Sequence, residues 1–285
     1  MENKTHINWY PGHMTKARRK IEESLKAINI VVEIVDSRIP VSSRNPDFED
    51  LFKGKKRILI LNKKDLADDR ITDKWVNYYK NQGVDVFAIS SIKNNKNKIL
   101  DFIKKSAAPI IEKYKAKGVN KVIRCMIVGI PNSGKSSFIN MIYGKAKVKA
   151  EDRPGVTRAN QWIKIDSMLE VMDTPGVLWP KLSDQDVAVN LSCVGSIKDD
   201  ILDIEEIACL LLQKLAKRYP ERITERYGIE LDEQGYIMLE RICQKRGFII
   251  KKDDYDYERG AKIVLDEFRG GKLGKISLEE PNFEV

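Results

Sequence analysis

The stretch VIRCMIVGIPNSGKSS, residues 122–137, decides the fold of the chain around it. Its apolar first half predicts a buried strand ending at Gly129, and an amphipathic segment at residues 138–143 predicts a helix after it. Between them, GIPNSGKS fits the pattern G-x-x-x-x-G-K-[ST], a loop whose backbone N–H groups wrap phosphate oxygens. The stretch therefore predicts a phosphate site at a helix N-terminus, where the helix dipole favours negative charge.

The residues of this loop have separate expected tasks. Lys135 reaches the β- and γ-phosphates, and the Ser136 hydroxyl holds Mg²⁺. The alternative, a glycine-rich turn that fits by chance, is disfavoured because a strand and a helix flank the loop in the required order. The nucleotide-binding residues expected here are Pro131, Asn132, Ser133, Gly134, Lys135, Ser136 and Ser137.

Composition limits the class of protein. The chain has 285 residues, enough for two domains that each bury a core, with 42% hydrophobic and 33% charged residues. It has no apolar run of about 18 residues and no apolar signal segment at its start, so we expect no membrane partner and a cytoplasmic location. The four cysteines form no C-x-x-C pair and read as reduced residues, three of them in apolar patterns.

Charge is unevenly distributed along the chain. Residues 1–180 hold 34 basic and 20 acidic residues, a net charge of +14, whereas residues 181–285 hold 17 and 22, a net charge of −5. Residues 93–124 carry ten basic residues against two acidic ones, a density that suits a polyanion larger than one nucleotide. A lysine-rich solvated surface explains the charge alone equally well.

A second motif, NKKD at residues 62–65, follows a predicted strand at residues 57–61. The Asp65 carboxylate at such a position accepts two hydrogen bonds from guanine N1–H and N2–H₂, which adenine does not offer. Asn62 would brace the pocket, and the Lys63 stem would cover the base. Ser90 and Ser91 end a further strand and are candidates to present a backbone N–H to guanine O6, although an ordinary turn is nearly as good an interpretation.

Two more segments complete the expected nucleotide site. Thr157, in a loop after the phosphate-binding helix, matches the switch threonine that coordinates Mg²⁺ and contacts the γ-phosphate. In DTPG, residues 173–176, Asp173 is expected to serve Mg²⁺ and the Gly176 N–H to bind the γ-phosphate. Val177 follows where many GTPases have a glutamine that positions water, and a valine side chain neither donates nor accepts a hydrogen bond. Hydrolysis therefore needs another group to orient water.

The order of the motifs predicts the topology. Six strands are expected, at residues 30–35, 57–61, 84–89, 122–128, 161–165 and 168–172. The base-reading tetrad precedes the phosphate loop, the reverse of most GTPases, and a circular permutation preserves every strand neighbour while moving the termini. The predicted fold class is α/β: a circularly permuted Ras-like P-loop GTPase domain with a six-stranded, mostly parallel sheet, followed by a smaller all-α domain. The expected boundaries are residues 1–180 and 181–285.

The chain resembles the circularly permuted ribosome-biogenesis GTPases of the RbgA/YlqF family. The segments NWYPGHM, DSRIPVSSRNP, NKKD, GIPNSGKS, RPGVT and DTPG occur in that family's order, and the resemblance covers essentially the whole chain. It implies GTP and GDP as ligands, hydrolysis stimulated by the large ribosomal subunit, a role in late maturation of that subunit, and contacts to its rRNA. It further implies that His13 orients the water and that Asn132 is a candidate K⁺ ligand. Tyr10 and Ser37 are mild departures, where Phe and Ala are usual.

The residues alone leave the role of His13 open, since it could equally be packed or contact RNA. Beyond residue 181 the pattern is helical, and the glycine-rich segment at residues 269–275 could touch a phosphate backbone or be a simple terminal turn. We expect a monomeric enzyme. The alternatives are a GTP-gated rRNA-binding scaffold whose hydrolysis is incidental and, more distantly, a P-loop ATPase or small-molecule kinase.

Overall fold

A computed structural model describes residues 12–93, 96–144, 161–180, 182–251 and 254–281 of the chain. A six-stranded sheet forms its centre, in the order β3-β2-β1-β4-β6-β5. Every neighbouring pair is parallel except β5 and β6, which are antiparallel. The strands are β1 (Ile30–Asp36), β2 (Lys56–Asn62), β3 (Asp85–Ala88), β4 (Ile123–Val128), β5 (Gln161–Lys164) and β6 (Leu169–Asp173).

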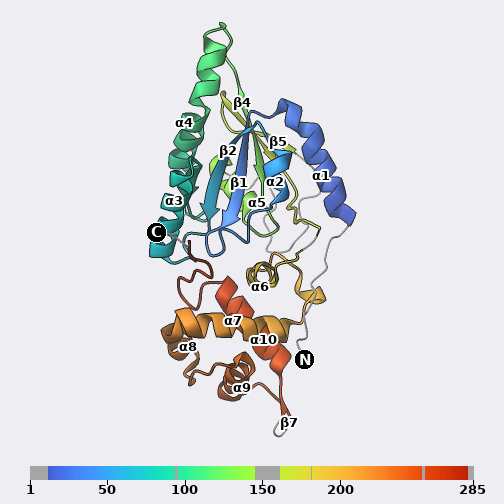
Figure 1. The fold of residues 1–285 in the computed structure, drawn as a ribbon, viewed down its shortest axis with the longest axis vertical. Helices are drawn as coiled ribbons and strands as arrows, with labels where there is room; N and C mark the ends of the chain where they lie inside the picture. Colours follow the sequence, from blue (N-terminus) through green and yellow to red (C-terminus); the bar gives the residue numbers. More distant parts are fainter. Residues whose placement is uncertain (1–11, 94–95, 145–160, 181, 252–253, 282–285) are drawn as a thin grey trace.

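Helices cover both faces of this sheet (Figure 1). On one face, α4 and α5 bury residues such as Ile103 and Phe138 against alternate residues of the strands, whereas α1, α2 and α3 pack on the other face through two further clusters. All seven residues of β1 are buried because helices lie on both sides of it. The helices of this part are α1 (Gly12–Ser24), α2 (Asp47–Leu51), α3 (Asp69–Asn81), α4 (Lys96–Lys115) and α5 (Lys135–Tyr143).

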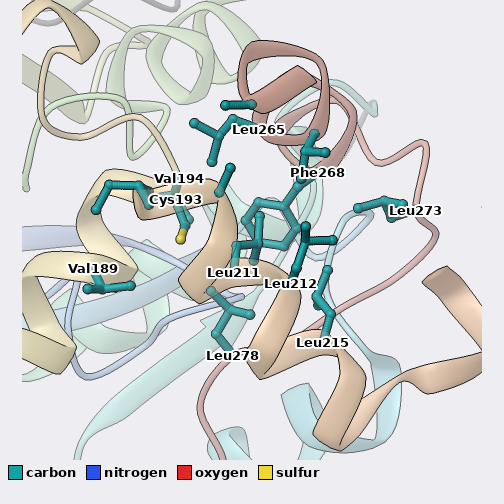
Figure 2. Close-up of a cluster of buried hydrophobic side chains, with 14 of the residues drawn as sticks. Val189, Cys193, Val194, Leu211, Leu212, Leu215, Leu265, Phe268, Leu273 and Leu278 are labelled. Atoms are coloured by element: carbon teal, nitrogen blue, oxygen red, sulfur yellow. The ribbon is translucent and has the colours of Figure 1, made fainter. Parts of the chain in front are cut away.

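The remaining helices lie beyond the end of the sheet toward which the parallel strands point (Figure 1). Leu211, Leu212 and Leu215 of α7 and Phe268 of α10 are central to their core, which Figure 2 shows. The same cluster includes Ile130 of the phosphate loop, so the apolar core is continuous from the helices to the nucleotide-binding edge of the sheet. These helices are α6 (Gln185–Cys193), α7 (Ile204–Arg218), α8 (Pro220–Tyr227), α9 (Gly235–Arg246) and α10 (Tyr257–Arg269).

Some elements were not predicted from the sequence. The short helix α2 lies in a segment for which no element was predicted, and a two-stranded antiparallel ribbon joins α9 to α10 in the part expected to be all helical. The ribbon strands are β7 (Ile249–Lys251) and β8 (Asp254–Tyr255), and the exposed Ile249 and Ile250 give no period-2 burial pattern that would reveal them.

After α10 the chain returns to the edge of the sheet as a segment that is neither helix nor strand, residues 273–280, which we call the C-terminal strap. Its backbone donates hydrogen bonds from Ile276 N to Leu66 O (3.0 Å) and from Leu278 N to Arg38 O (2.8 Å). The strap therefore joins the last helix to the loops that follow β1 and β2. No helix within the described ranges has the length and apolar character required to cross a membrane.

Candidate nucleotide-binding site

The predicted motifs meet at one edge of the sheet. NKKD follows β2 and the phosphate loop follows β4, while β1 lies between these two strands and β6 lies on the far side of β4. Because these four strands are parallel, their carboxyl ends and the loops after them share this edge. Segments separated by more than 60 residues along the chain are thereby brought together.

Asn62 connects three parts of the site. Its Nδ2 donates to the Ser133 carbonyl in the phosphate loop (2.9 Å), and its Oδ1 accepts from Ser91 N (3.2 Å) and Ser91 Oγ (2.7 Å) at the tip that follows β3. The side chain is 1% exposed, so these hydrogen bonds replace those it would make to water. The loop expected to read the base, the loop expected to hold the phosphates and the tip expected to face guanine O6 are thus joined by one buried amide.

The two main loops also hold strained backbone. Among the described residues, Lys63 (φ 59°) and Asn132 (φ 58°) are the non-glycine residues with positive φ. Such conformations cost free energy and persist where surrounding contacts impose them, most often at functional sites. Gly134 (φ 91°) approaches Asn62 so closely that an added Cβ would lie 2.2 Å from Asn62 Nδ2. A side chain at position 134 would therefore separate the two loops.

Lys135 lies at the start of α5, where its ammonium is 2.7 Å from the Ile130 carbonyl of the same loop. Burial lowers the pKa of Lys135 to about 8; the nearby Asp173 carboxylate raises it and Lys63 lowers it further. The side chain is 7% exposed. A buried cation that lacks full charge compensation suits a ligand which brings several negative charges.

The DTPG segment packs directly on the phosphate loop. The Thr174 hydroxyl donates to Ile127 O (2.7 Å), and a Cβ added at Gly176 would lie 2.7 Å from backbone atoms of Pro131. Val177 is 3% exposed and its side chain packs with residues of α1 and α2, so it lies in a core and has no group to orient water. Movement of DTPG would therefore act on the phosphate loop and on that core together.

The donor set fits Mg²⁺. Asp173 is buried at the end of β6, opposite Ile127 of β4 in the sheet register, and Ser136 lies near the start of α5 after the same β4. Oxygen donors suit this ion, which commonly takes one or two protein ligands together with substrate phosphates. The described residues hold no cluster of three or more His, Cys, Asp or Glu that could bind a metal.

Some predicted site residues have no described side-chain position. Thr157 lies outside the described residues, and for His13 the structure describes only a backbone position at the start of α1. Asp65 is half-buried in the turn after Lys63, Ser90 is buried, and Ser137 is half-buried in α5. The nucleotide or metal contacts expected of these residues are still predictions.

The structure adds residues that sequence reasoning did not assign to the site. Asp36, at the end of β1, contacts the Lys63 ammonium through its Oδ2 atom (3.1 Å), and Arg38 binds the same carboxylate. Asn132 donates from Nδ2 to Gly195 O (2.6 Å), and Ser196 Oγ donates to Pro131 O (2.9 Å). The available signal for Asp36 was a carboxylate at the end of a mostly apolar buried strand, next to two strands that carry motifs.

Two cations of the C-terminal segment that could touch a phosphate backbone have partners within the chain. Within the glycine-rich segment at residues 269–275, Arg269 binds Asp199 through two nitrogens (2.7 and 2.8 Å) and donates to carbonyls at the end of α6. Lys275 pairs with Asp69 at 2.5 Å. These two cations hold the fold together, which leaves the exposed Lys272 as the basic side chain of this segment without such a described pair.

Comparisons with known proteins agree with this geometry. Residues 124–238 match the profile of a family described as "50S ribosome-binding GTPase", a match that includes the phosphate loop and DTPG but begins after NKKD. Ribosome biogenesis GTPase A of Bacillus cereus is 44% identical over 278 residues, which is 96% of this chain and 94% of that protein.

Solved structures of YlqF from Thermotoga maritima are similar along nearly the whole chain. The structure described as GNP-bound has a TM-score of 0.67 and 28% identity, with 94% of this chain and 99% of that chain covered. The GDP-bound structure has a TM-score of 0.68 and 29% identity, with 92% and 99% covered. With its loops assembled in the permuted order, this chain belongs to the ribosome biogenesis GTPase A (RbgA/YlqF) family and is a GTP-hydrolysing enzyme.

Proposed function

We propose that this GTPase acts in the late maturation of the large ribosomal subunit and that the subunit stimulates its hydrolysis of GTP. The observation that supports this most is the buried Asn62 bridge, which joins a guanine-reading tetrad to a phosphate loop in a chain whose relatives are named ribosome biogenesis GTPases. A relative from cattle is named a mitochondrial ribosome-associated GTPase. The ribosome is thus common to the names of these relatives.

The proposed chemistry assigns a task to each part of the pocket. Asp65 selects guanine, and Lys135 with the phosphate-loop N–H groups stabilises the negative charge that develops on the transferred phosphoryl oxygens. Ser136, Thr157 and Asp173 would hold Mg²⁺, which supplies further charge neutralisation at the phosphates when bound. Asn132 is in addition a candidate K⁺ ligand.

His13 is proposed to orient the attacking water. The motivation is Val177, whose side chain is apolar and buried where many GTPases have a glutamine. An imidazole accepts or donates a hydrogen bond near neutral pH and suits this task. A partner that fixes the segment around His13 would then raise the rate, which accounts for stimulation by the subunit.

The proposed partner is the rRNA of the large subunit. Residues 1–180 carry the net charge of +14, and lysines of α4 such as Lys105, Lys113 and Lys115 are exposed, as electrostatic attraction to RNA phosphates requires. We assign residues 1–180 to the nucleotide-binding domain and residues 181–285 to a helical RNA-binding domain in a cytoplasmic monomer. Hydrogen bonds from Asn132 to Gly195 and from Ser196 to Pro131 offer a route by which nucleotide state affects the helices.

The test is the GTPase rate with and without purified large subunits. We expect subunits to raise kcat of the wild type by about a hundredfold or more, within the range by which activating partners act on GTPases. His13→Ala should lose most of the stimulation while its GDP affinity is kept. His6→Ala, a change at the other histidine of the chain, is the matched control, and small subunits control for general RNA effects.

If large subunits leave the rate unchanged but bind the protein only in the presence of a GTP analogue, the scaffold interpretation replaces this proposal. Stimulation that is identical in the wild type and in His13→Ala would instead remove the role of His13 and keep the function.

A further inference from the structure

A carboxylate lies between the two nucleotide-binding loops and belongs to neither. Asp36 ends β1, the strand between β2, which leads to Lys63, and β4, which leads to the phosphate loop. The residue is 1% exposed, and its Oδ2 is 3.1 Å from the Lys63 ammonium. The position of β1 in the sheet thus places an anchor beside the lysine that is expected to cover the base.

Arg38 fixes this anchor. Its Nε donates to Asp36 Oδ1 (2.9 Å) and its Nη2 to Asp36 Oδ2 (2.8 Å), while its backbone N–H donates to Oδ1 (3.0 Å). Bidentate pairs of this kind set the orientation of both groups as well as their separation. Arg38 is itself 1% exposed, and the two opposite charges compensate each other away from solvent.

The anchored lysine lies over the phosphate loop. A Cβ added at Gly134 would be 4.0 Å from Lys63 Cε, so the lysine stem passes along Gly134 before its ammonium reaches Asp36. Lys63 has φ 59°, a backbone conformation that neighbouring contacts must maintain. With its end fixed, the flexible stem is preorganised as one wall of the base pocket.

The C-terminal strap and α10 hold Arg38 from the opposite side. Leu278 N donates to Arg38 O (2.8 Å), Arg38 Nη1 donates to Phe268 O (3.4 Å), and the guanidinium carbon is 5.0 Å from the centroid of the Phe268 ring. Figure 2 shows Phe268 and Leu278 within the cluster of buried side chains around α7. Arg38 therefore contacts Asp36, beside the nucleotide-binding loops, and also contacts the core of the helical part.

Glu279 secures the same loop a few residues further on. Its carboxylate accepts hydrogen bonds from Val41 N (2.6 Å), Ser42 N (3.0 Å), the Ser42 hydroxyl and Asn190 Nδ2 (3.2 Å). All of these partners are donors, so an amide in place of the carboxylate would turn an N–H₂ group toward N–H and O–H groups. Glu279→Gln should thus weaken the attachment of the strap to this loop without shortening the side chain.

We propose that Asp36 is a positioning residue for guanine-nucleotide binding, and that the C-terminal strap keeps it in place through Arg38. The inference rests on the base-reading role proposed for the NKKD loop. The proposal gives the last residues of the chain an effect on nucleotide affinity. The effect is indirect, because these residues contact the loop after β1 and not the residues proposed to bind the nucleotide.

The experiment compares equilibrium dissociation constants of fluorescent GDP and of a nonhydrolysable GTP analogue, without ribosomes, for the full chain and three variants. Asp36→Asn should raise both constants by about tenfold, the effect of losing a charge-assisted contact. Glu279→Gln should raise both by about threefold to fivefold. The factor should be the same for the two nucleotides because the base is common to both.

The matched control is Lys74→Ala. It removes an exposed ion pair between α3 and the strap residue Glu280, and it leaves Arg38 and the loop at residues 41–42 in place. This variant should bind both nucleotides like the wild type. Melting temperatures measured in parallel separate a loss of folded protein from a loss of affinity in the folded fraction.

Unchanged affinity in folded Asp36→Asn would overturn the positioning role, and unchanged affinity in Glu279→Gln would overturn the role of the strap. If Asp36→Asn does not fold because Arg38 is left without its partner, Glu279→Gln decides the proposal. Failure of the wild type to bind guanine nucleotides would instead refute the function proposed above.

Discussion

Asn62 and Asp65 belong to one tetrad but act by different chemistry. The structure gives Asn62 a structural task, since its amide holds the phosphate loop and the Ser91 tip on opposite sides. Asp65 is half-buried in the turn after it, where it is available to a ligand. Base selection is therefore a property of Asp65 that can be changed without disturbing the Asn62 bridge.

Asp65→Asn should change the preferred base from guanine to xanthine. Xanthine has a carbonyl oxygen at C2 in place of the amino group, so an amide N–H₂ donates to it where a carboxylate cannot. We expect GDP affinity to fall by at least about a hundredfold and xanthosine diphosphate to become the better ligand. Competition titrations against a fluorescent nucleotide measure both values, and an unchanged base preference would show that Asp65 does not read the base.

Lys135 gives nucleotide binding a dependence on pH. Burial lowers the pKa of this lysine to about 8 in the nucleotide-free protein, and bound phosphates favour its charged form. Affinity for GDP is then highest below pH 8 and falls as the pH rises above it. At pH 9 about one lysine in ten is charged before binding, so the dissociation constant should be about tenfold higher than at pH 7.

The measurement is GDP binding by calorimetry between pH 6.5 and 9 in buffers of different ionisation enthalpy, which also gives the protons taken up. Lys135→Met should bind weakly at every pH and lose the dependence between pH 7 and 9. A wild-type affinity that stays constant over this range would mean that the lysine is fully charged in the free protein.

At the scale of elements, α7 supports the whole helical part. Asp203 caps its N-terminus by accepting from Glu206 N (3.0 Å), and Lys217 and Arg218 lie in its last turn, where they complement the helix dipole. Its apolar face packs against α6, α9 and α10. Figure 2 shows its leucines beside residues of α6 and α10. The stability of α7 therefore depends mainly on this packing.

Leu212→Ala should lower the free energy of unfolding by about 2–5 kcal/mol, because the side chain is fully buried and its loss leaves a cavity. Urea denaturation followed by circular dichroism measures the change. Lys217→Ala, on the exposed side of the same helix, should change stability by less than about 0.5 kcal/mol. Equal effects of the two substitutions would contradict the assigned packing.

The sequence predicted helices and strands well where a single local signal was sufficient. The mostly apolar run of β1 and the helical pattern beyond residue 181 are local signals that need no knowledge of distant residues. The strap has no such signal, since it is neither helix nor strand and its partner Arg38 lies 240 positions earlier. The Asp36–Lys63 contact depends on strand order, which motifs suggest but burial patterns do not specify.

At the scale of the whole molecule, the core crosses the expected domain boundary. Ile39 and Ile130 from the nucleotide-binding part pack in the same cluster as Leu211 and Phe268, and the strap adds Ile276 and Leu278. Residues 1–180 alone would expose apolar surface at the very edge where nucleotide binds. We therefore expect the chain to unfold as one cooperative unit in spite of its two-part architecture.

Two probes test this cooperativity. All four tryptophans lie before residue 181, so their fluorescence reports on the sheet part, whereas far-ultraviolet circular dichroism reports largely on helices. The two midpoints should coincide in urea, and Leu212→Ala should lower both by the same amount. Midpoints separated by more than about 0.5 M would show that the parts unfold independently.

The boundary in the sheet between the paired strands β1 and β4 has one more consequence. Strands β1, β2 and β3 lie on one side of it and strands β4, β5 and β6 on the other, and the connection at residues 116–120 is exposed. A protease cut there would sever the polypeptide but leave the parallel pairing of β1 with β4 and the Asn62 bridge intact. Guanine nucleotide would then bind loops from both fragments and hold them together, so the reassociation of the fragments would depend on nucleotide concentration.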